Sequence, residues 1–114
     1  MEFITAAHKE RYQEFIEKAK CSNDSERKAL FYIISSNEDL SRKVSYIYDF
    51  HEKAIIPDCF EKADFCSSSK ALLKLAFNLY NSFNKCNICD CLSMQDEDNF
   101  EVAVNALKLR FGRI

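Results

Sequence analysis

The sequence predicts an all-α fold, a compact single domain of about five helices over residues 1–114. Two observations favour this class. Five segments repeat apolar residues at the three- and four-residue spacing of amphipathic helices. The chain also has only one glycine, Gly112, and one proline, Pro57, whereas β-hairpins depend on glycine for turns with positive φ. A chain of this length buries roughly two-thirds of its unfolded surface on folding, which is enough for one core.

The first two helices are expected in the amino-terminal third of the chain. Thr5 is suited to cap the first helix, which reaches about Ala19. The second helix spans about 25–34, and Asn23 and Glu26 ahead of it have the spacing of a capping box. Because "ALFYII" makes its end apolar on most faces, we expect this helix to lie centrally. The apolar face of the first helix consists of Tyr12, Phe15, Ile16 and Ala19.

The third segment, "EDLSRKVSYIYDFHEK", supports two interpretations between residues 44 and 51. Leu40, Val44 and Ile47 recur at helical spacing, but Val44, Tyr46 and Tyr48 alternate as they would in a strand. We favour a helix because the segment is long and follows a capping residue, either Ser36 or Asn37. The strand remains open as the alternative.

Two further helices are expected in the second half. After Pro57 sets a turn, "PDCFEKADF" is expected to add one short helical turn. The fourth helix, "KALLKLAFNLYNSF", is apolar on most sides, and we expect it to be the core helix at the centre of the fold. The fifth begins at "QDEDN", whose acidic residues suit the positive end of a helix. It reaches about Phe111, with Gly112 suited to its carboxyl-terminal end.

Three stretches, "ERKALFYIISSNEDLSRKVSYIYDF", "KALLKLAFNLYNSF" and "NFEVAVNALKLRF", carry a family resemblance. Together they resemble a family of proteins of about this length from Gram-positive bacteria, their phages and mobile elements, catalogued as a domain of unknown function. The resemblance covers most of the chain and rests on core residues. It implies a compact single domain in a mobile-element context, and it transfers no catalytic residue to this chain.

The stretch "SFNKCNICDCLSM" holds Cys86, Cys89 and Cys91 and is the main candidate for metal chemistry. Cys86 and Cys89 have the spacing of a zinc knuckle, with Cys91 as a third ligand, and a structural zinc site needs four. Cys59, Cys66 or His51 would have to supply the fourth. Without a second CxxC or a nearby glycine, the competing interpretation is a loop of free thiols packed partly on the core.

A redox role for the same cysteines is not favoured. A reactive CxxC begins a helix, where the helix dipole lowers the thiol pKa. Here the motif is expected after the fourth helix, at its negative end and beside Asp90. Both effects disfavour the thiolate.

Tyr46 and Phe50 are the candidate residues for a protein interface. If their segment is helical, they share a face distinct from that of Val44 and Ile47. Aromatic side chains outside the core are favoured anchors of protein interfaces. The competing expectation is that a small domain with ten phenylalanines and five tyrosines buries most of them.

Composition removes several classes of function. A net charge of −2 predicts no general attraction to nucleic acid or acidic membranes. A single glycine cannot supply a dinucleotide-binding fingerprint or a P-loop. The start "MEFITAAHKERY" lacks a secretory signal, and no stretch is long enough to span a membrane. We therefore expect a cytoplasmic protein with reduced cysteines.

The function expected from these observations is not enzymatic. His8 and His51 are the only histidines, and neither has an evident partner for general-base catalysis. We expect an interaction or regulatory protein without a cofactor, carried by a phage or mobile element. It would bind and inhibit a host protein or protein complex, for example a component of CRISPR–Cas or another defence system, and nucleic acid is not expected as a direct partner. The alternative is a small structural domain that holds zinc through Cys86, Cys89 and Cys91.

Overall fold

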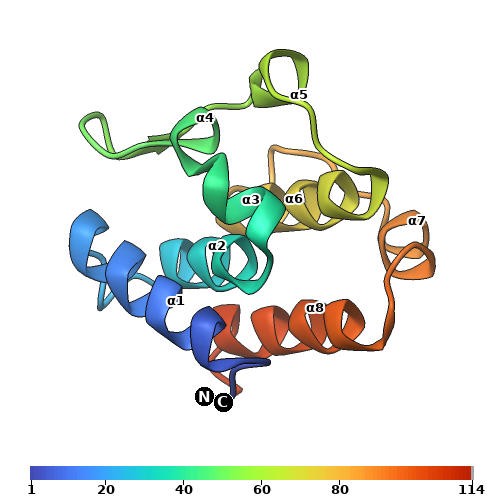
Figure 1. Cartoon of the computed structure of the whole chain (residues 1–114), viewed down its shortest axis with the longest axis horizontal. Coiled ribbons are helices and arrows are strands. Elements are labelled where there is room, and N and C mark those ends of the chain that lie inside the picture. The colour runs from blue at the N-terminus through green and yellow to red at the C-terminus, as the bar shows by residue number, and fades with distance from the viewer. Residues whose placement is uncertain (114) are drawn as a thin grey trace.

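The computed structural model describes residues 1–113 and is built mainly from helices (Figure 1). The all-α prediction is confirmed, with one two-stranded antiparallel hairpin added. The four long helices are α1 (Ala6–Ala19), α2 (Ser25–Ser36), α6 (Ser67–Tyr80) and α8 (Glu97–Arg110). The four short helices are α3 (Glu38–Arg42), α4 (Val44–Ile47), α5 (Cys59–Lys62) and α7 (Ile88–Ser93). The strands are β1 (Tyr48–Asp49) and β2 (Ala54–Ile55), with Tyr48 opposite Ile55.

These elements enclose one core. The Cα radius of gyration is 12.6 Å, close to the value of about 13 Å expected for a single domain of this size. α1 and α8 lie on one side of α2, and the short helices α3, α4 and α5 lie on the other (Figure 1). Within residues 1–113, no helix is both long enough and apolar enough to cross a membrane.

The central helix is α2, and the prediction that the fourth helix forms the centre is wrong. Every residue from Ala29 to Ser35 is buried, and α1, α6 and α8 all pack against α2. A helix buried on all sides has no face for charged residues, and this part of α2 carries none. The fourth predicted helix corresponds to α6. It buries one side against α2 and leaves a stripe containing Lys70 and Lys74 at the surface.

Side-chain caps set the starts of α1, α2 and α3. Thr5 caps α1 as predicted, and its hydroxyl accepts a hydrogen bond from the backbone N–H of His8 (3.0 Å). Asn37 caps α3, one of the two residues predicted there. The predicted capping box at Asn23 is wrong, because Asp24 caps α2 and accepts from the backbone N–H groups of Glu26 and Arg27.

The segment predicted as a third long helix follows both of the patterns that its sequence contains. Helix α3 ends at Arg42 and α4 ends at Ile47, and the chain then becomes extended in β1. The helical spacing therefore holds up to Ile47 and the alternating spacing applies from Tyr48. The predicted helix over the whole segment is wrong.

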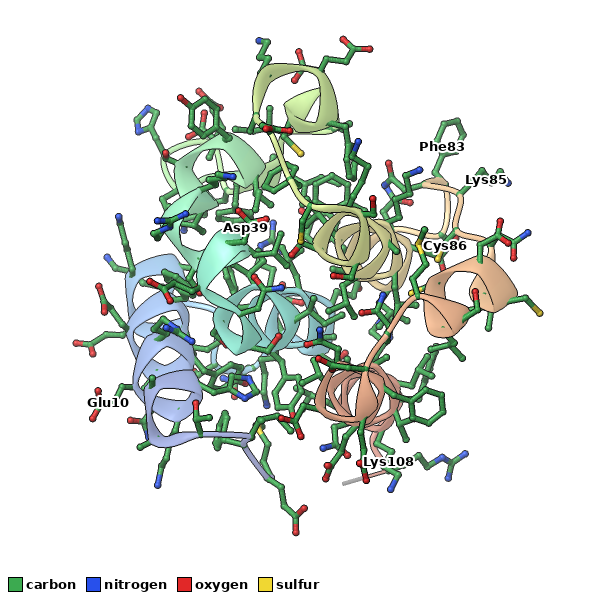
Figure 2. All side chains as sticks on the ribbon, turned by 45° about the vertical axis from the view of Figure 1, so that its right-hand side comes forward. Glu10, Asp39, Phe83, Lys85, Cys86 and Lys108 are labelled. Carbon is green, nitrogen blue, oxygen red and sulfur yellow. The ribbon has the colours of Figure 1, made fainter. Side chains whose placement is uncertain are left out.

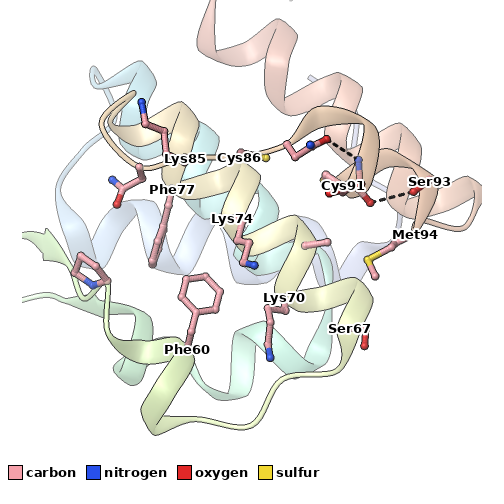
Figure 3. A pocket seen from close by; sticks show the side chains of 15 residues that line it. Phe60, Ser67, Lys70, Lys74, Phe77, Lys85, Cys86, Cys91, Ser93 and Met94 are labelled. Atoms are coloured by element: carbon pink, nitrogen blue, oxygen red, sulfur yellow. Dashed lines mark hydrogen bonds between the residues drawn. The ribbon is translucent and has the colours of Figure 1, made fainter.

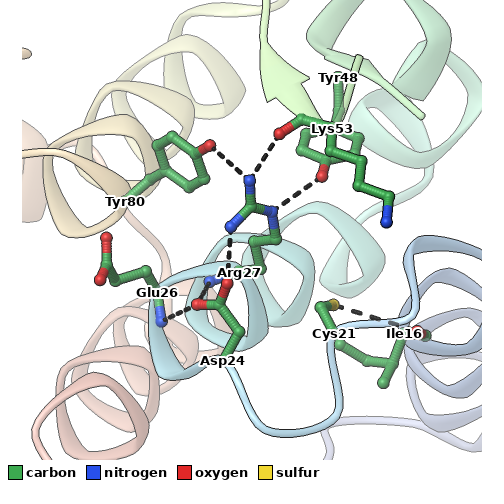
Figure 4. Close-up of polar contacts among 8 residues, drawn as sticks. All are labelled: Ile16, Cys21, Asp24, Glu26, Arg27, Tyr48, Lys53 and Tyr80. Carbon is green, nitrogen blue, oxygen red and sulfur yellow. Dashed lines mark hydrogen bonds and ion pairs between the residues drawn. The ribbon is translucent and has the colours of Figure 1, made fainter. Parts of the chain in front are cut away.

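Arg27 explains why the chain turns at this point. Its guanidinium lies among groups from three parts of the fold (Figure 4). Nε donates to the hydroxyl of Tyr48 (2.9 Å) on β1, and Nη2 donates to the hydroxyl of Tyr80 (3.1 Å) at the end of α6. Nη2 also donates to the carbonyl of Lys53 (2.5 Å), and Nη1 pairs with Asp24 (2.6 Å). One side chain of α2 thus fixes the hairpin and the carboxyl end of α6.

His8 closes the core at the start of α1 and is fully buried. Its Nδ1 accepts from the backbone N–H of Ile4 (3.1 Å), and its Nε2 lies 2.9 Å from the carbonyl oxygen of Tyr32. These contacts require the neutral ring with its proton on Nε2. Burial lowers the pKa of His8 below its ordinary value of 6.5, and Arg11 lowers it further, although the Tyr32 carbonyl works in the opposite direction.

Replacing Arg27 with methionine should reduce the free energy of unfolding by about 2–4 kcal/mol, because Tyr48 and Tyr80 lose a charged hydrogen-bond donor. The matched control is Arg42→Met, at an exposed position on α3, which should change stability by less than about 0.5 kcal/mol. Urea unfolding followed by circular dichroism measures both. Equal effects of the two substitutions would show that the guanidinium contacts do not hold the fold together.

Acidification should destabilise the fold through His8. Its pKa is lower in the folded chain than in the unfolded chain, so the unfolded state binds more protons below about pH 6.5. Stability should therefore fall as the pH is lowered from about 7.5 to about 5.5, and His8→Gln should remove most of this dependence. His51 lies exposed, so His51→Gln should leave it intact. Thermal unfolding at a series of pH values tests this, and an unchanged pH dependence in His8→Gln would contradict it.

Candidate functional site

A groove of about 590 Å³ lies over the outer face of α6 (Figure 3). One wall comes from Pro57, just before α5, and from Phe60, within α5. The other wall comes from residues 84–94, which include α7. Its floor is a stripe of α6 residues spaced by three and four positions. We call it the α6 groove, and its floor consists of Ser67, Lys70, Ala71, Lys74 and Phe77.

The α7 wall is held against α6 by Gln95, which follows α7. Its Nε2 donates to the carbonyl of Ser68 on α6 (3.1 Å) and to the carbonyl of Cys91 on α7 (3.0 Å). Asn87 begins α7 by accepting from the backbone N–H of Asp90 (3.0 Å). One amide side chain therefore joins the first turn of α6 to α7, and a second fixes where α7 starts.

The groove has apolar surface on both walls. The Phe60 ring packs edge-on against the Phe77 ring on the floor, with 5.6 Å between centroids. On the opposite wall the side chain of Met94 is 52% exposed. The cavity thus offers aromatic and thioether contacts to whatever enters it.

The charge of the groove is positive. Lys70 and Lys74 lie one turn apart on the floor, and Lys85 comes from the loop above them. No partner in residues 1–113 forms an ion pair with these three lysines. Among the described residues that line the groove, Asp90 is the only acidic one. No sequence motif singles out these lysines. In the sequence, Lys70 and Lys74 could have been noticed as two charged residues, four positions apart, on an otherwise apolar helix.

The loop between α6 and α7 presents Phe83 to solvent. Its side chain is 85% exposed, and it projects from the same loop as Lys85 (Figure 2). The loop is braced by asparagines. Asn81 accepts from the backbone N–H of Phe83 (3.0 Å), and Asn78 Nδ2 donates to the carbonyl of Asn84 (2.8 Å). The loop backbone that carries the exposed ring is therefore braced by local hydrogen bonds.

The three clustered cysteines do not lie where they were predicted. Only Cys86 is in the loop, and Cys89 and Cys91 belong to α7, near its amino-terminal end. Cys91 is buried and its thiol contacts that of Cys86, while Cys89 is exposed. In the described part of the chain, no three His, Cys, Asp or Glu side chains lie together as a metal site would require. The arrangement therefore gives no support to the zinc alternative.

Tyr46 and Phe50, the predicted interface pair, differ in their surroundings. Tyr46 on α4 is 50% exposed. Phe50 stacks against the buried Phe31 ring, with 5.7 Å between centroids and 16° between planes, and Lys18 Nζ lies 4.4 Å from its centroid. Because the helix ends at Ile47, the two residues do not share one helical face. Tyr46 alone remains open to a partner.

Cys66 is the cysteine whose surroundings favour reactivity. It is exposed at the start of α6, and its Sγ lies 3.1 Å from Ser69 Oγ. Hydrogen bonds with the hydroxyl and backbone N–H of Ser69 lower the pKa of the Cys66 thiol. In contrast, burial raises the pKa of Cys59 and of Cys91, each to about 11.

Cys66 should react faster with a small disulfide reagent than the buried cysteines, because it combines exposure with a lowered pKa. Ser69→Ala should slow this fast phase by about two- to tenfold. Cys66→Ser should abolish it, whereas Cys89→Ser, at a second exposed cysteine, should leave it unchanged. Stopped-flow absorbance on the reduced protein measures the phases. A fast phase that survives in Cys66→Ser would refute the assignment.

Comparison with known proteins assigns no function. Neither the curated proteins nor the solved structures contain a match to this chain. One family of proteins of unknown function matches residues 1–114, the whole chain. This chain therefore belongs to the DUF6075 family.

Proposed function

We propose that this protein is a non-catalytic interaction protein that binds a host protein through the α6 groove and the loop beside it. The observation that carries the proposal is the exposure of Phe83 on a loop braced by Asn78 and Asn81. Burying an aromatic side chain of this size contributes roughly 1.5–3 kcal/mol. A partner that covers the ring would gain this energy without having to order the loop.

Two more apolar side chains are exposed on and just after α7. Ile88 is 44% exposed at the start of α7, and Met94 follows the end of the same helix. Aromatic residues and methionine are enriched at the centre of protein interfaces, and charged residues are depleted there. Phe83 and Ile88 are exposed but do not line the groove. Exposed apolar side chains outside a groove suit a macromolecular partner better than a ligand enclosed by the groove alone.

The surroundings of the histidines also favour binding over catalysis. Both ring nitrogens of His8 are engaged inside the core, so the ring is not available to a substrate. His51 lies exposed in the turn between β1 and β2, away from the α6 groove. The described lining of the groove includes lysines, asparagines, serines, two cysteines, apolar residues and Asp90, and it holds no histidine, the commonest general acid or base. General acid–base chemistry therefore has little support at this site.

The biological setting is part of the proposal and comes from the family resemblance. The resemblance supports a setting in Gram-positive bacteria, their phages and mobile elements, and we propose that the protein acts in the cytoplasm. We propose that binding inhibits the host partner by covering one of its working surfaces, and a CRISPR–Cas or other defence component is one concrete form of such a partner. Inhibition of this kind requires shape and charge complementarity and no chemistry in the inhibitor.

A binding experiment with two opposed variants tests the proposed surface. The tagged protein should retain a host protein in stoichiometric amount from a Gram-positive lysate, and the purified pair should bind in calorimetry. The double variant Phe83→Ser, Met94→Ser should weaken this binding at least about tenfold. Tyr46→Ser, at a half-exposed aromatic on α4 outside the groove, should leave it unchanged.

Three results would count against this proposal. Turnover of a substrate by the purified protein, or the absence of any stoichiometric partner, would overturn the interaction function itself. Binding that depends on Tyr46 but not on Phe83 and Met94 would keep the function and move the surface to α4.

A further inference from the structure

The distribution of acidic residues sets the α6 groove apart from the rest of the chain. The protein has 18 acidic residues, yet none occurs between Asp64 and Asp90. This stretch supplies the floor of the groove and half of the lining residues of one wall. Its three basic residues are Lys70, Lys74 and Lys85, and all three line the groove. A positive site is therefore built into a chain whose net charge is −2.

The lysines lack the neighbours that usually neutralise surface charge. The ion pairs of the described residues join Arg27 to Asp24, Lys43 to Asp39 and Lys62 to Asp58, so three basic residues outside the groove have acidic partners three or four positions away. Lys70 and Lys74 instead have each other at that spacing, and like charges one helical turn apart repel. An anionic partner would relieve this repulsion.

The apolar surface limits what kind of anion fits. Lys74 Nζ lies 5.9 Å from the centroid of the Phe60 ring, so charge and aromatic surface are presented side by side. Met94 faces the groove from the other wall (Figure 3). A free phosphate would use the lysines and leave these apolar contacts empty. Nucleic acid would need a longer basic track than three lysines, and Asp90 interrupts this one.

We propose that the α6 groove binds an acidic amphipathic segment of the protein partner, with carboxylates on Lys70, Lys74 and Lys85 and apolar side chains between Phe60 and Met94. This inference rests on the proposed function and names the chemistry of the partner. Lys70 and Lys74 are about 6 Å apart along the helix axis. Two carboxylates one turn apart on a helix, or two residues apart on an extended peptide, match that spacing.

Peptide display tests the proposal without knowledge of the partner. A random-peptide library is selected against the whole protein, and enriched peptides are synthesised with a fluorescent label. We expect an excess of Asp and Glu together with Leu, Phe or Met. Replacing the acidic residues of an enriched peptide with Asn or Gln should weaken binding at least about tenfold, and binding should weaken as salt is raised.

Matched charge reversals in the protein locate the binding site. Lys70→Glu with Lys74→Glu should weaken peptide binding at least about tenfold. Lys9→Glu with Lys108→Glu changes the net charge equally at exposed positions on α1 and α8, outside the groove, and should alter binding by less than about twofold. Circular dichroism and thermal unfolding confirm that both double variants fold.

The following results would contradict the proposed binding of an acidic segment. Peptides without an acidic excess, no enrichment at all, or equal effects of the two charge reversals would overturn it. Tighter groove-dependent binding of a single-stranded oligonucleotide would replace the peptide with nucleic acid, and equal competition by inorganic phosphate would reduce the site to a simple anion site. If the host partner depends on Phe83 and Met94 but not on Lys70 and Lys74, the acidic segment is wrong while the proposed function stands.

Discussion

The burial of α2 on every side is the constraint on which the other elements depend. Because the residues from Ala29 to Ser35 have no solvated face, three long helices must cover them. Near its start, α2 makes polar contacts through Arg27 that lead outward to the hairpin and to the end of α6. The core thus fixes where α6 lies, and the outer stripe of α6 becomes the floor of the groove.

Much of the fold follows from local sequence, and the main exceptions have tertiary causes. The four long helices and the caps Thr5 and Asn37 are predictable from periodicity and capping chemistry, both of which act within a few residues. The cap at Asp24 is also local, and capping chemistry predicted it one residue too early, at Asn23. The break after Ile47 has a tertiary cause, because Arg27 bonds to Tyr48, which lies 21 positions further along the chain. The centre of the fold is equally hard to predict, since α2 and α6 are both strongly apolar and only packing distinguishes them.

The candidate site was less predictable than the fold. Cysteines and aromatics attract attention because their chemistry is distinctive, yet Cys91 packs against α6 and Phe50 packs on Phe31. The groove is lined by lysines and asparagines, which are common at protein surfaces. They form a site only because the fold places α6 opposite the segment that includes α7. The asparagines from 78 to 87 brace the loop and cap α7.

The bracing of the loop at Phe83 has a kinetic consequence. A flexible loop loses conformational entropy when it docks, and the association rate is lower when the loop must first adopt its bound conformation. Here Asn78 and Asn81 have already removed that freedom during folding. For a partner that docks at this edge as proposed, the free and bound backbone of the loop should be nearly the same, and association should resemble a rigid-body encounter. Affinity differences among related partners would then reside mainly in how long the complex lasts.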